Sequence, residues 1–191
     1  MLAPAPNPTI RHKMNRRSLL LLLSVLLPVS SVSAEDKERL AAHAETIAGK
    51  VESALEENLL SEAQIYSYLT LMVTHDELVY GSALAFNPEF LQGHTFFLQD
   101  NITEDGRILY SPYVHRDKEQ LLRAFDIGNI SKAHGYDYTT WDWYKAPMSE
   151  QKPHWTEPYF DEGGGEINMV TYSIPIGEKA ILTFDMRVDE E

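Results

Sequence analysis

Apolar and polar residues alternate most regularly near the end of the chain. Ile167–Ile176 alternates with a period of two, which predicts a strand, and neither of its faces is wholly apolar. The aromatic-rich segment Trp155–Phe160 before it and the apolar run Ala180–Val188 after it predict two further strands. Gly163–Gly165 predicts the turn between the first two, because glycine adopts positive φ without a steric penalty. The C-terminal third therefore predicts an antiparallel meander with a helix on one face and a polar pocket on the other.

A long amphipathic helix is predicted for residues 35–75. Ser33 or Asp36 is expected to cap its start, and Ser61 followed by Glu62 is expected to cap a second segment. Because a single stripe of this length exceeds an ordinary globular helix, the first half is expected to pair with a second copy of the chain or to lie along the domain as a stalk. The second half is expected to pack on the sheet. The apolar positions of the first half are Leu40, Ala44, Ile47, Ala48, Val51, Leu55 and Leu59.

The middle of the chain predicts two more strands and two helical segments. In the first strand, Gly81 and Ala83 leave room for a close neighbour. Arg116–Asp126 is predicted to be helical, and Asp142–Ala146 is predicted to form a helical turn that directs Trp143 and Tyr144 toward the sheet. The whole pattern predicts an α+β fold, a five-stranded antiparallel sheet with a long N-terminal helix packed on one side. Its strands are expected at about 78–86, 106–114, 155–160, 167–176 and 179–188.

The first 34 residues have the pattern of an export signal. Four basic residues between Arg11 and Arg17 precede the apolar run Leu19–Val32, and small residues end at Ala34. The run is short for a membrane span, which needs about 20 residues. We expect either a signal peptide cleaved after Ala34 or an uncleaved signal anchor. The chain then divides into the export signal at residues 1–34, the helix at 35–75 and a domain at 76–191. We expect this domain to lie in the periplasm, or to be held on the outer side of the inner membrane by an anchor.

Charge and composition exclude several classes of function. The 191 residues include 16 Lys and Arg against 29 Asp and Glu, a net charge of −13. Removing the first 34 residues removes four basic residues and no acidic one, which leaves 12 − 29 = −17. A surface this acidic repels phosphate backbones, so no nucleic-acid partner is expected. The chain has no Cys, which excludes disulfides, thiolate catalysis and Cys-based zinc sites.

Sequence motifs of enzymes are absent from the chain. It contains no GxSxG, no HExxH and no glycine-rich phosphate loop, and we expect no cofactor and no resident metal. Two alternatives to a ligand-binding module stay open. One is a periplasmic metal-assisted hydrolase that uses Asp161, Glu162 and a His. The other is a module without a ligand, which dimerises through the N-terminal helix.

Aromatic side chains lie next to carboxylates in the second half of the chain. Ring faces attract cations and a nearby carboxylate adds Coulomb attraction, so this composition fits an amine or a quaternary ammonium ligand. The alternative is that each ring is an ordinary core residue. Asp185 differs from the others because it interrupts an apolar strand, where a charge is costly unless it is paired or faces a polar cavity.

Three segments carry a resemblance to a known family: DWYKAP at Asp142–Pro147, WTEPYFDEGGG at Trp155–Gly165 and MVTYSIPI at Met169–Ile176. With the long helix before them, they resemble the membrane-distal, PAS-like module of double-Cache (PDC) sensors, which form the extracytoplasmic part of many chemoreceptors and sensor kinases. The resemblance covers about residues 35–189. It implies a PAS-like fold and a sensor that binds a small molecule and changes the N-terminal helix or its dimer.

The resemblance also implies roles for single residues. In amino-acid-binding members, a Trp-Tyr pair contacts the ligand, and two Asp bind its amino group. Trp141 stands where those members have the Arg that pairs with the ligand's carboxylate, so we expect a ligand with a positive or neutral head and no obligatory carboxylate. The expected ligand-binding residues are Trp143, Tyr144, Trp155, Tyr159, Asp161 and Asp185.

The expected partners are the small-molecule ligand, a second copy of the chain and a signalling protein. The chain ends at Glu191, just after the last predicted strand, whereas relatives of this kind usually continue into a membrane span and an output domain. We therefore expect either a fragment of a larger receptor or a periplasmic sensor that passes its signal to a separate membrane protein.

Overall fold

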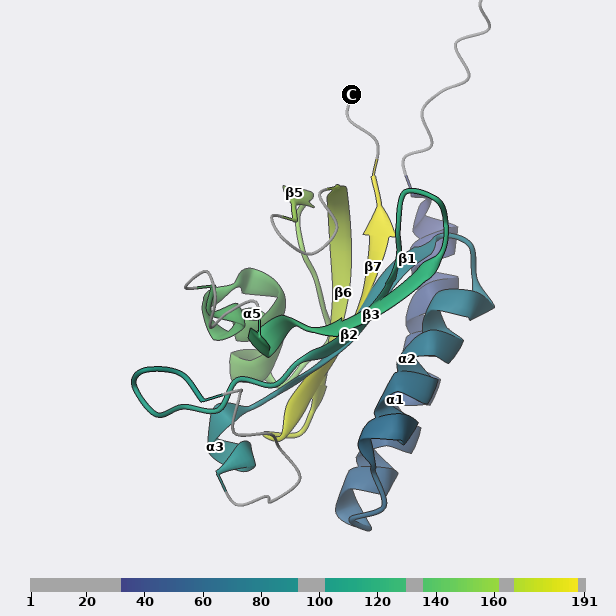
Figure 1. Ribbon diagram of the computed structural model, residues 1–191. Helices are drawn as coiled ribbons and strands as arrows, with labels where there is room; N and C mark the ends of the chain where they lie inside the picture. The colour runs from purple at the N-terminus through teal and green to yellow at the C-terminus, as the bar shows by residue number, and fades with distance from the viewer. Residues whose placement is uncertain (1–31, 93–101, 130–135, 162–166, 189–191) are drawn as a thin grey trace, which may run out of the picture.

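An antiparallel sheet lies between two groups of helices in the computed structural model of the chain (Figure 1). The structure describes residues 32–92, 102–129, 136–161 and 167–188. Nearly all of the predicted export signal and the whole Gly163–Gly165 turn lie outside these residues. Within them, the predicted α+β fold with an N-terminal helix packed on an antiparallel sheet is confirmed.

The sheet contains seven strands among the described residues, and all of its pairs are antiparallel. Its order is β3-β2-β1-β7-β6-β4, and β5 also pairs with β6. The N-terminal strand β1 thus lies next to the C-terminal strand β7 at the centre of the sheet (Figure 1). The strands are β1 (Val79–Phe86), β2 (Pro112–Arg116), β3 (Leu122–Asp126), β4 (His154–Trp155), β5 (Tyr159–Phe160), β6 (Asn168–Ile176) and β7 (Ala180–Arg187).

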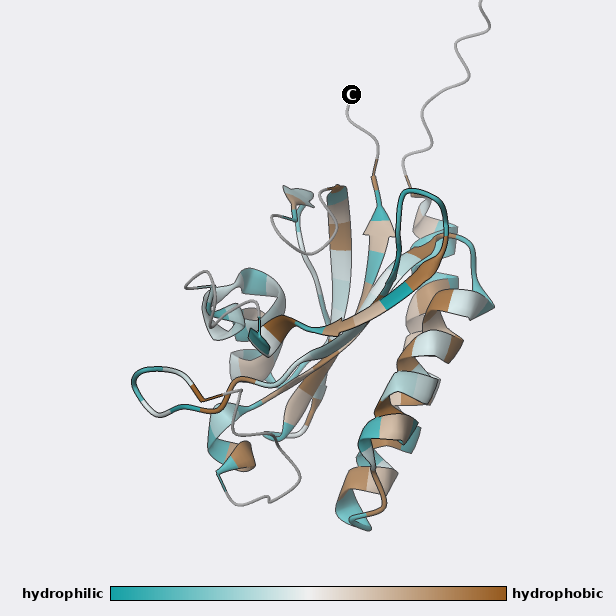
Figure 2. Cartoon of the chain, in the orientation of Figure 1, coloured by the Kyte–Doolittle hydropathy of each residue, from teal (hydrophilic) through white to brown (hydrophobic). Residues whose placement is uncertain are grey.

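The prediction of a helix at Arg116–Asp126 is wrong, because this segment forms the second half of the β2–β3 hairpin. The carboxylate of Asp117 accepts hydrogen bonds from the backbone N–H groups of Glu119, at 3.0 Å, and Leu121, at 2.9 Å. Gln120 adopts a positive φ of 63°. These turn interactions compete with helix formation. The β2–β3 turn is drawn largely in teal in Figure 2, as its polar sequence requires.

The predicted strand at residues 155–160 divides into β4 and β5. Trp155 pairs with Tyr172 on β6, whereas Tyr159 pairs with Met169. The chain therefore advances by four residues where its partner advances by three, as in a β-bulge. One consequence is that Trp155 and Tyr159, which a regular strand would place on the same face, lie on opposite faces of the sheet. The predicted strand at residues 106–114 also differs, because β2 begins only at Pro112.

The predicted long helix is an antiparallel pair of helices, α1 (Ala34–Glu56) and α2 (Glu62–His75). Ser33 caps α1 by accepting a hydrogen bond from the Asp36 N–H, and Ser61 forms a capping box with Gln64 at the start of α2. Between the helices, Asn58 adopts a left-handed φ of 54°. Both helices lie on the same side of the sheet, with α1 against β6 and α2 against β1 and β2 (Figure 1).

The apolar stripe of α1 packs on the sheet of the same chain. Leu40, Ala44 and Ile47 are each at most 1% exposed and belong to one core cluster with Val170 of β6 and Phe184 of β7. The stripe is therefore covered within the chain and does not form an unpartnered stalk. Dimerisation through this helix stays a prediction, and it would have to use the outer surface of α1 unless the helix moves.

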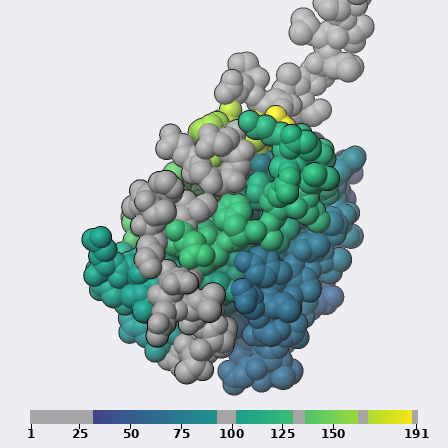
Figure 3. Space-filling model, viewed as in Figure 1, coloured from purple at the N-terminus to yellow at the C-terminus, as the bar shows by residue number. Residues whose placement is uncertain are grey.

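The opposite face of the sheet carries a second, smaller core under the short helices α5 (Asp142–Glu150) and η2 (Tyr138–Thr140). Trp143 and Tyr144 point from α5 into this core, as predicted, and pack with Tyr138, Ala85 and Ile181. The helix α3 (Pro88–Leu91) follows β1 at the lower end of the sheet (Figure 1). On the visible surface, α2 and the β2–β3 hairpin adjoin each other (Figure 3), and Arg116 Nη2 donates to the Val73 carbonyl at 2.7 Å between them.

Replacing Ile47 with Ala tests whether α1 packs on its own sheet. Because Ile47 is only 1% exposed, Ile47→Ala should lower the free energy of unfolding by about 2–5 kcal/mol, measured by urea denaturation. Leu59→Ala is the control, because Leu59 is 58% exposed and should change stability by less than about 0.5 kcal/mol. Equal, small effects of both variants would contradict the packing. The packing would also be contradicted if the urea midpoint of the unmodified chain rose with protein concentration and that of Ile47→Ala did not, because Ile47 would then lie in a dimer interface.

Candidate ligand-binding site

Asp185 is a buried carboxylate near the centre of the sheet. It lies on β7 and is 5% exposed, and its neighbours Phe184 and Met186 point into the large core on the other face. The Thr171 hydroxyl on β6 donates a hydrogen bond to Asp185 Oδ1 at 2.8 Å. Among the described residues, no Lys, Arg or His side chain forms an ion pair with Asp185. The fold therefore holds a carboxylate out of water beside neutral hydroxyl groups, with no counter-charge paired to it in the described part of the chain.

The environment of Asp185 favours its neutral form. Burial raises the pKa of Asp185 to about 7, and the negative charge of Asp161 acts in the same direction. The hydroxyl groups of Thr171 and Tyr113 lower the pKa but do not offset the burial. This carboxyl group therefore titrates in the physiological range, well above the ordinary value for Asp.

Phenol groups surround the two carboxylates. The Tyr159 hydroxyl is 2.8 Å from Thr171 Oγ1. Since a hydroxyl carries one proton, Tyr159 must donate to Thr171 whenever Thr171 donates to Asp185. Burial raises the pKa values of Tyr159 and Tyr136, and the charges of Asp161 and Asp185 raise them further. The phenols thus stay neutral and available as hydrogen-bond donors.

Tyr113 presents an unused donor to the same region. It is 2% exposed, and its hydroxyl has no hydrogen-bond partner among the described residues. Burial raises its pKa well above the ordinary value, and Asp185 and Asp161 add to the effect. A Cβ atom on Gly81, which pairs with Asp185 across β1 and β7, would overlap the Tyr113 ring. Gly81 therefore makes the room that the sequence predicted, and the Tyr113 ring occupies it.

The aromatic wall of the site comes from the segment before α5. The Tyr136 and Trp141 ring centroids are 5.1 Å apart, and those of Trp141 and Tyr159 are 6.2 Å apart. Trp141 and Tyr159 also border a cavity of about 200 Å³. The other residues that line this cavity are Asp142, Trp143, Thr156, Glu157 and Pro158.

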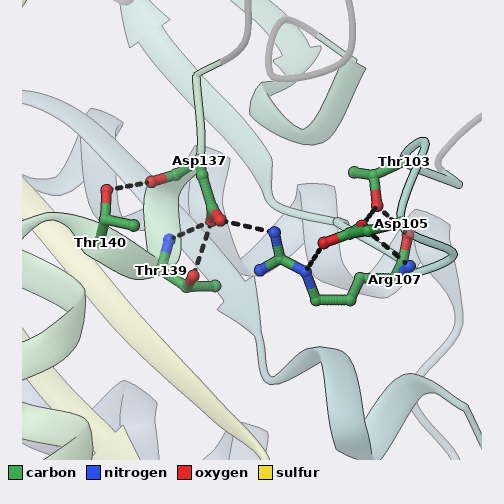
Figure 4. A network of polar contacts seen from close by, with 6 residues as sticks. All are labelled: Thr103, Asp105, Arg107, Asp137, Thr139 and Thr140. Atoms are coloured by element: carbon green, nitrogen blue, oxygen red, sulfur yellow. Dashed lines mark hydrogen bonds and ion pairs between the residues drawn. The ribbon is translucent and has the colours of Figure 1, made fainter.

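A polar network fixes the start of this wall (Figure 4). The Arg107 guanidinium bridges Asp105, at 2.7 Å, and Asp137, at 2.9 Å. Asp137 in turn accepts hydrogen bonds from the Thr139 N–H, at 3.0 Å, and the Thr139 hydroxyl, at 2.6 Å. These contacts hold η2 against the loop that carries Asp105 and Arg107. They thereby also position Tyr136, which precedes η2, and Trp141, which follows it.

The structure brings together only part of the predicted site. Asp161, Asp185 and Tyr159 lie on one side of the sheet, where Asp161 is near enough to raise the pKa values of the other two. Trp143 borders the cavity, although it is only 5% exposed and its ring stacks on Tyr138. Tyr144 is equally buried in the small core.

Trp155 lies away from the other predicted site residues, on the face of the sheet that carries α1. Its ring stacks on Tyr172 with centroids 4.7 Å apart, and Lys37 Nζ lies 5.1 Å from its centroid. The bulge between β4 and β5 explains this position, because it reverses which face Trp155 shares with Tyr159.

Two residues of the site were not predicted, Thr171 and Tyr113. The alternation of β6 does place Thr171 on the polar face, so a signal for it was present in the sequence. The position of Tyr113 depends on the pairing of β1 with β2, far apart in the sequence, and no local pattern indicates it. For metal chemistry, no three His, Asp or Glu side chains of the described residues converge on a possible ion site, and Glu162 lies outside those residues.

These features define a PAS-like sensor domain, and the comparisons with known proteins agree. Residues 65–190 match the model of the family described as methyl-accepting chemotaxis protein-like, first PDC sensor domain. The chain belongs to this family. It is thus a sensor domain of the kind found in the extracellular parts of chemoreceptors and histidine kinases. No curated protein matches the chain.

Solved structures similar to this chain include extracellular and periplasmic sensor domains. The extracellular domain of the putative histidine kinase soHK1S-Z6 is 27% identical, with a TM-score of 0.58 over 79% of this chain and 54% of that one. Methyl-accepting chemotaxis protein X is 19% identical, with a TM-score of 0.62 over 78% and 55%. The periplasmic sensory domain of the Campylobacter jejuni chemoreceptor Tlp1 is 13% identical, with a TM-score of 0.53 over 78% and 53%.

The chain spans about half the length of these structures. Of the helices that the structure describes, none combines the length and the apolar character needed to cross a membrane.

Asp185→Asn should change how stability depends on pH. The folded chain holds a proton on Asp185 up to about pH 7, whereas the unfolded chain releases it near pH 4, so rising pH destabilises the fold between those values. From pH 5 to pH 8 this group removes about 3 kcal/mol of unfolding free energy, and Asp185→Asn abolishes that loss. Urea denaturation across this pH range measures it. The control is Glu119→Gln, at an exposed carboxylate in the β2–β3 turn, and parallel profiles of all three proteins would contradict the burial of Asp185.

Proposed function

We propose that this chain is an extracytoplasmic sensor domain that binds a small molecule with an amine or other cationic head and no obligatory carboxylate. The observation that carries the proposal is the pair of carboxylates, Asp161 and Asp185, on a face lined by neutral phenols. Asp185 has no ion-pair partner among the described residues, so a cation from outside the chain would be its first counter-charge.

The aromatic wall supports a cationic ligand over an amino acid. Ring faces of Trp and Tyr attract cations, most strongly where water is excluded. Trp141, between Tyr136 and Tyr159, occupies the position at which the resemblance to amino-acid-binding members implies an Arg. An indole offers no charge to a carboxylate. We therefore infer that the carboxylate of an α-amino acid finds no Arg to pair with in this site, whereas the binding of a plain amine does not depend on such a pair.

The proposed location is outside the cytoplasm. Residues 1–34 have the composition of an export signal or a signal anchor, and the similar solved domains are extracellular or periplasmic. The domain would then lie free in the periplasm or be held at the inner membrane.

Strand β6 offers a direct route from the site to the helices. Thr171 faces Asp185, whereas the next residue, Tyr172, faces α1, where its hydroxyl donates to Glu45 Oε1 at 3.0 Å. A ligand that moves β6 toward itself would act on this contact. It could shift the position of α1 only by as much as it binds one arrangement better than the other. A partner copy or a separate membrane protein would read that shift.

Calorimetric titration with two matched panels tests the proposed function. Simple amines and choline should bind, and the α-amino acids of similar size should bind no more tightly than the amines. Asp185→Ala and Asp161→Ala should each weaken amine binding tenfold or more, because a charge-assisted hydrogen bond contributes about 1.5–3 kcal/mol.

Glu119→Gln is the control, since it removes a similar charge from the β2–β3 turn, and its affinity should equal that of the unmodified chain. Tight binding of α-amino acids together with no binding of plain amines would refute the proposed ligand class. Unchanged affinity in both Asp variants would refute the proposed site.

A further inference from the structure

A cation that binds beside Asp185 meets a carboxyl group that already carries a proton. We propose that Asp185 holds this proton before ligand binding and releases it when a cationic ligand binds, so that the sensor responds to the ligand and to pH together. This inference rests on the proposed function and adds a form of regulation to the same site.

Asp185 lies buried within the sheet. A carboxylate that is 5% exposed must be compensated by hydrogen bonds or an opposite charge. The structure supplies the Thr171 hydroxyl, which is shared with Tyr159, and the Tyr113 hydroxyl, which also lowers the pKa of Asp185. Two neutral hydroxyls do not compensate a buried charge, so the carboxyl group keeps its proton.

Most of the groups that face Asp185 from the surrounding elements are neutral. Four are phenols, which stay neutral over the physiological range and supply no positive charge: Tyr80 on β1, Tyr113 on β2, Tyr136 before η2 and Tyr159 on β5. His115 on β2 stacks on Tyr113, and burial lowers its pKa, so it is also neutral near pH 7.

Two charged side chains complete these surroundings. Asp161, after β5, raises the pKa of Asp185, and Arg187, two residues beyond Asp185, lies near enough to lower the pKa of Tyr80. Arg187 forms no ion pair with Asp185. The charge that shifts the pKa of Asp185 is that of Asp161, and it is negative. A second negative charge at Asp185 would add repulsion, so the pair gives up its last proton late.

A bound cation changes the balance of charge at Asp185. An ammonium group between Asp161 and Asp185 supplies the missing counter-charge and favours both carboxylates in their ionised form. The protonated carboxyl and the free cation become a carboxylate paired with the bound cation, and one proton passes to the solvent. Below the pKa of Asp185, affinity should then rise about tenfold for each pH unit, and above it affinity should level off.

Calorimetry with choline and phenethylamine at pH 6, 7 and 8, each in two buffers of different ionisation enthalpy, tests the exchange. Choline carries no dissociable proton, so any proton released must come from the protein. We expect close to one proton released per ligand at pH 6 and an affinity that rises about fivefold between pH 6 and pH 7, because the group is half titrated at the upper pH. Asp185→Asn should release none and lose this pH dependence, whereas Glu119→Gln should behave like the unmodified chain.

A second measurement separates this inference from the proposed function. Carbon-13 NMR of the Asp185 carboxyl in the protein without ligand should show a titration midpoint near neutral pH. A midpoint near pH 4, or no proton release on binding, would overturn the exchange even if both probes bind. If neither probe binds at any pH, the proposed ligand class fails, and the exchange fails with it.

Discussion

A carboxyl group buried in the middle of an antiparallel sheet is the constraint on which the rest of this structure depends. Asp185 shares strand β7 with Phe184 and Met186, which lie in the large core, so the strand cannot turn the carboxyl group to solvent without exposing that core. The free-energy cost of burying a charge must then be offset by groups on the face of the sheet opposite the large core. The neutral phenols and the Thr171 hydroxyl of that face accommodate a protonated Asp185, and a cationic ligand would accommodate an ionised one.

The two faces of the sheet have different tasks. One face binds α1 and α2 through a continuous apolar layer, and it gives the domain most of its core. The other is packed against η2 and α5 and carries a small cavity that Tyr159 borders, while Tyr113 and Asp185 lie buried on the same face. Since β6 and β7 contribute alternate side chains to both faces, anything that moves these strands acts on both. This arrangement suits a domain that detects a molecule on one side and displaces a helix on the other.

Much of this division could be predicted from local sequence, because strand alternation is a local property. The alternation of Ile167–Ile176 indicated a helix on one face and a polar pocket on the other, and Asp185 stood out within an apolar strand. The failures have non-local or competing causes. The turn at Asp117 overrode helical spacing in the β2–β3 hairpin, and a one-residue bulge moved Trp155 to the helix side. Tyr113 reaches the site only through strand pairing, which a single sequence does not reveal.

A crystal structure of the domain with a bound primary amine would test the central claim most directly. The account predicts the ammonium nitrogen within hydrogen-bonding distance of both the Asp161 and Asp185 carboxylates, with the ring of Tyr159 or Trp141 against its carbon atoms. An Asp185 carboxylate that is paired with Arg187, turned to bulk solvent or sealed beneath packed side chains would contradict it.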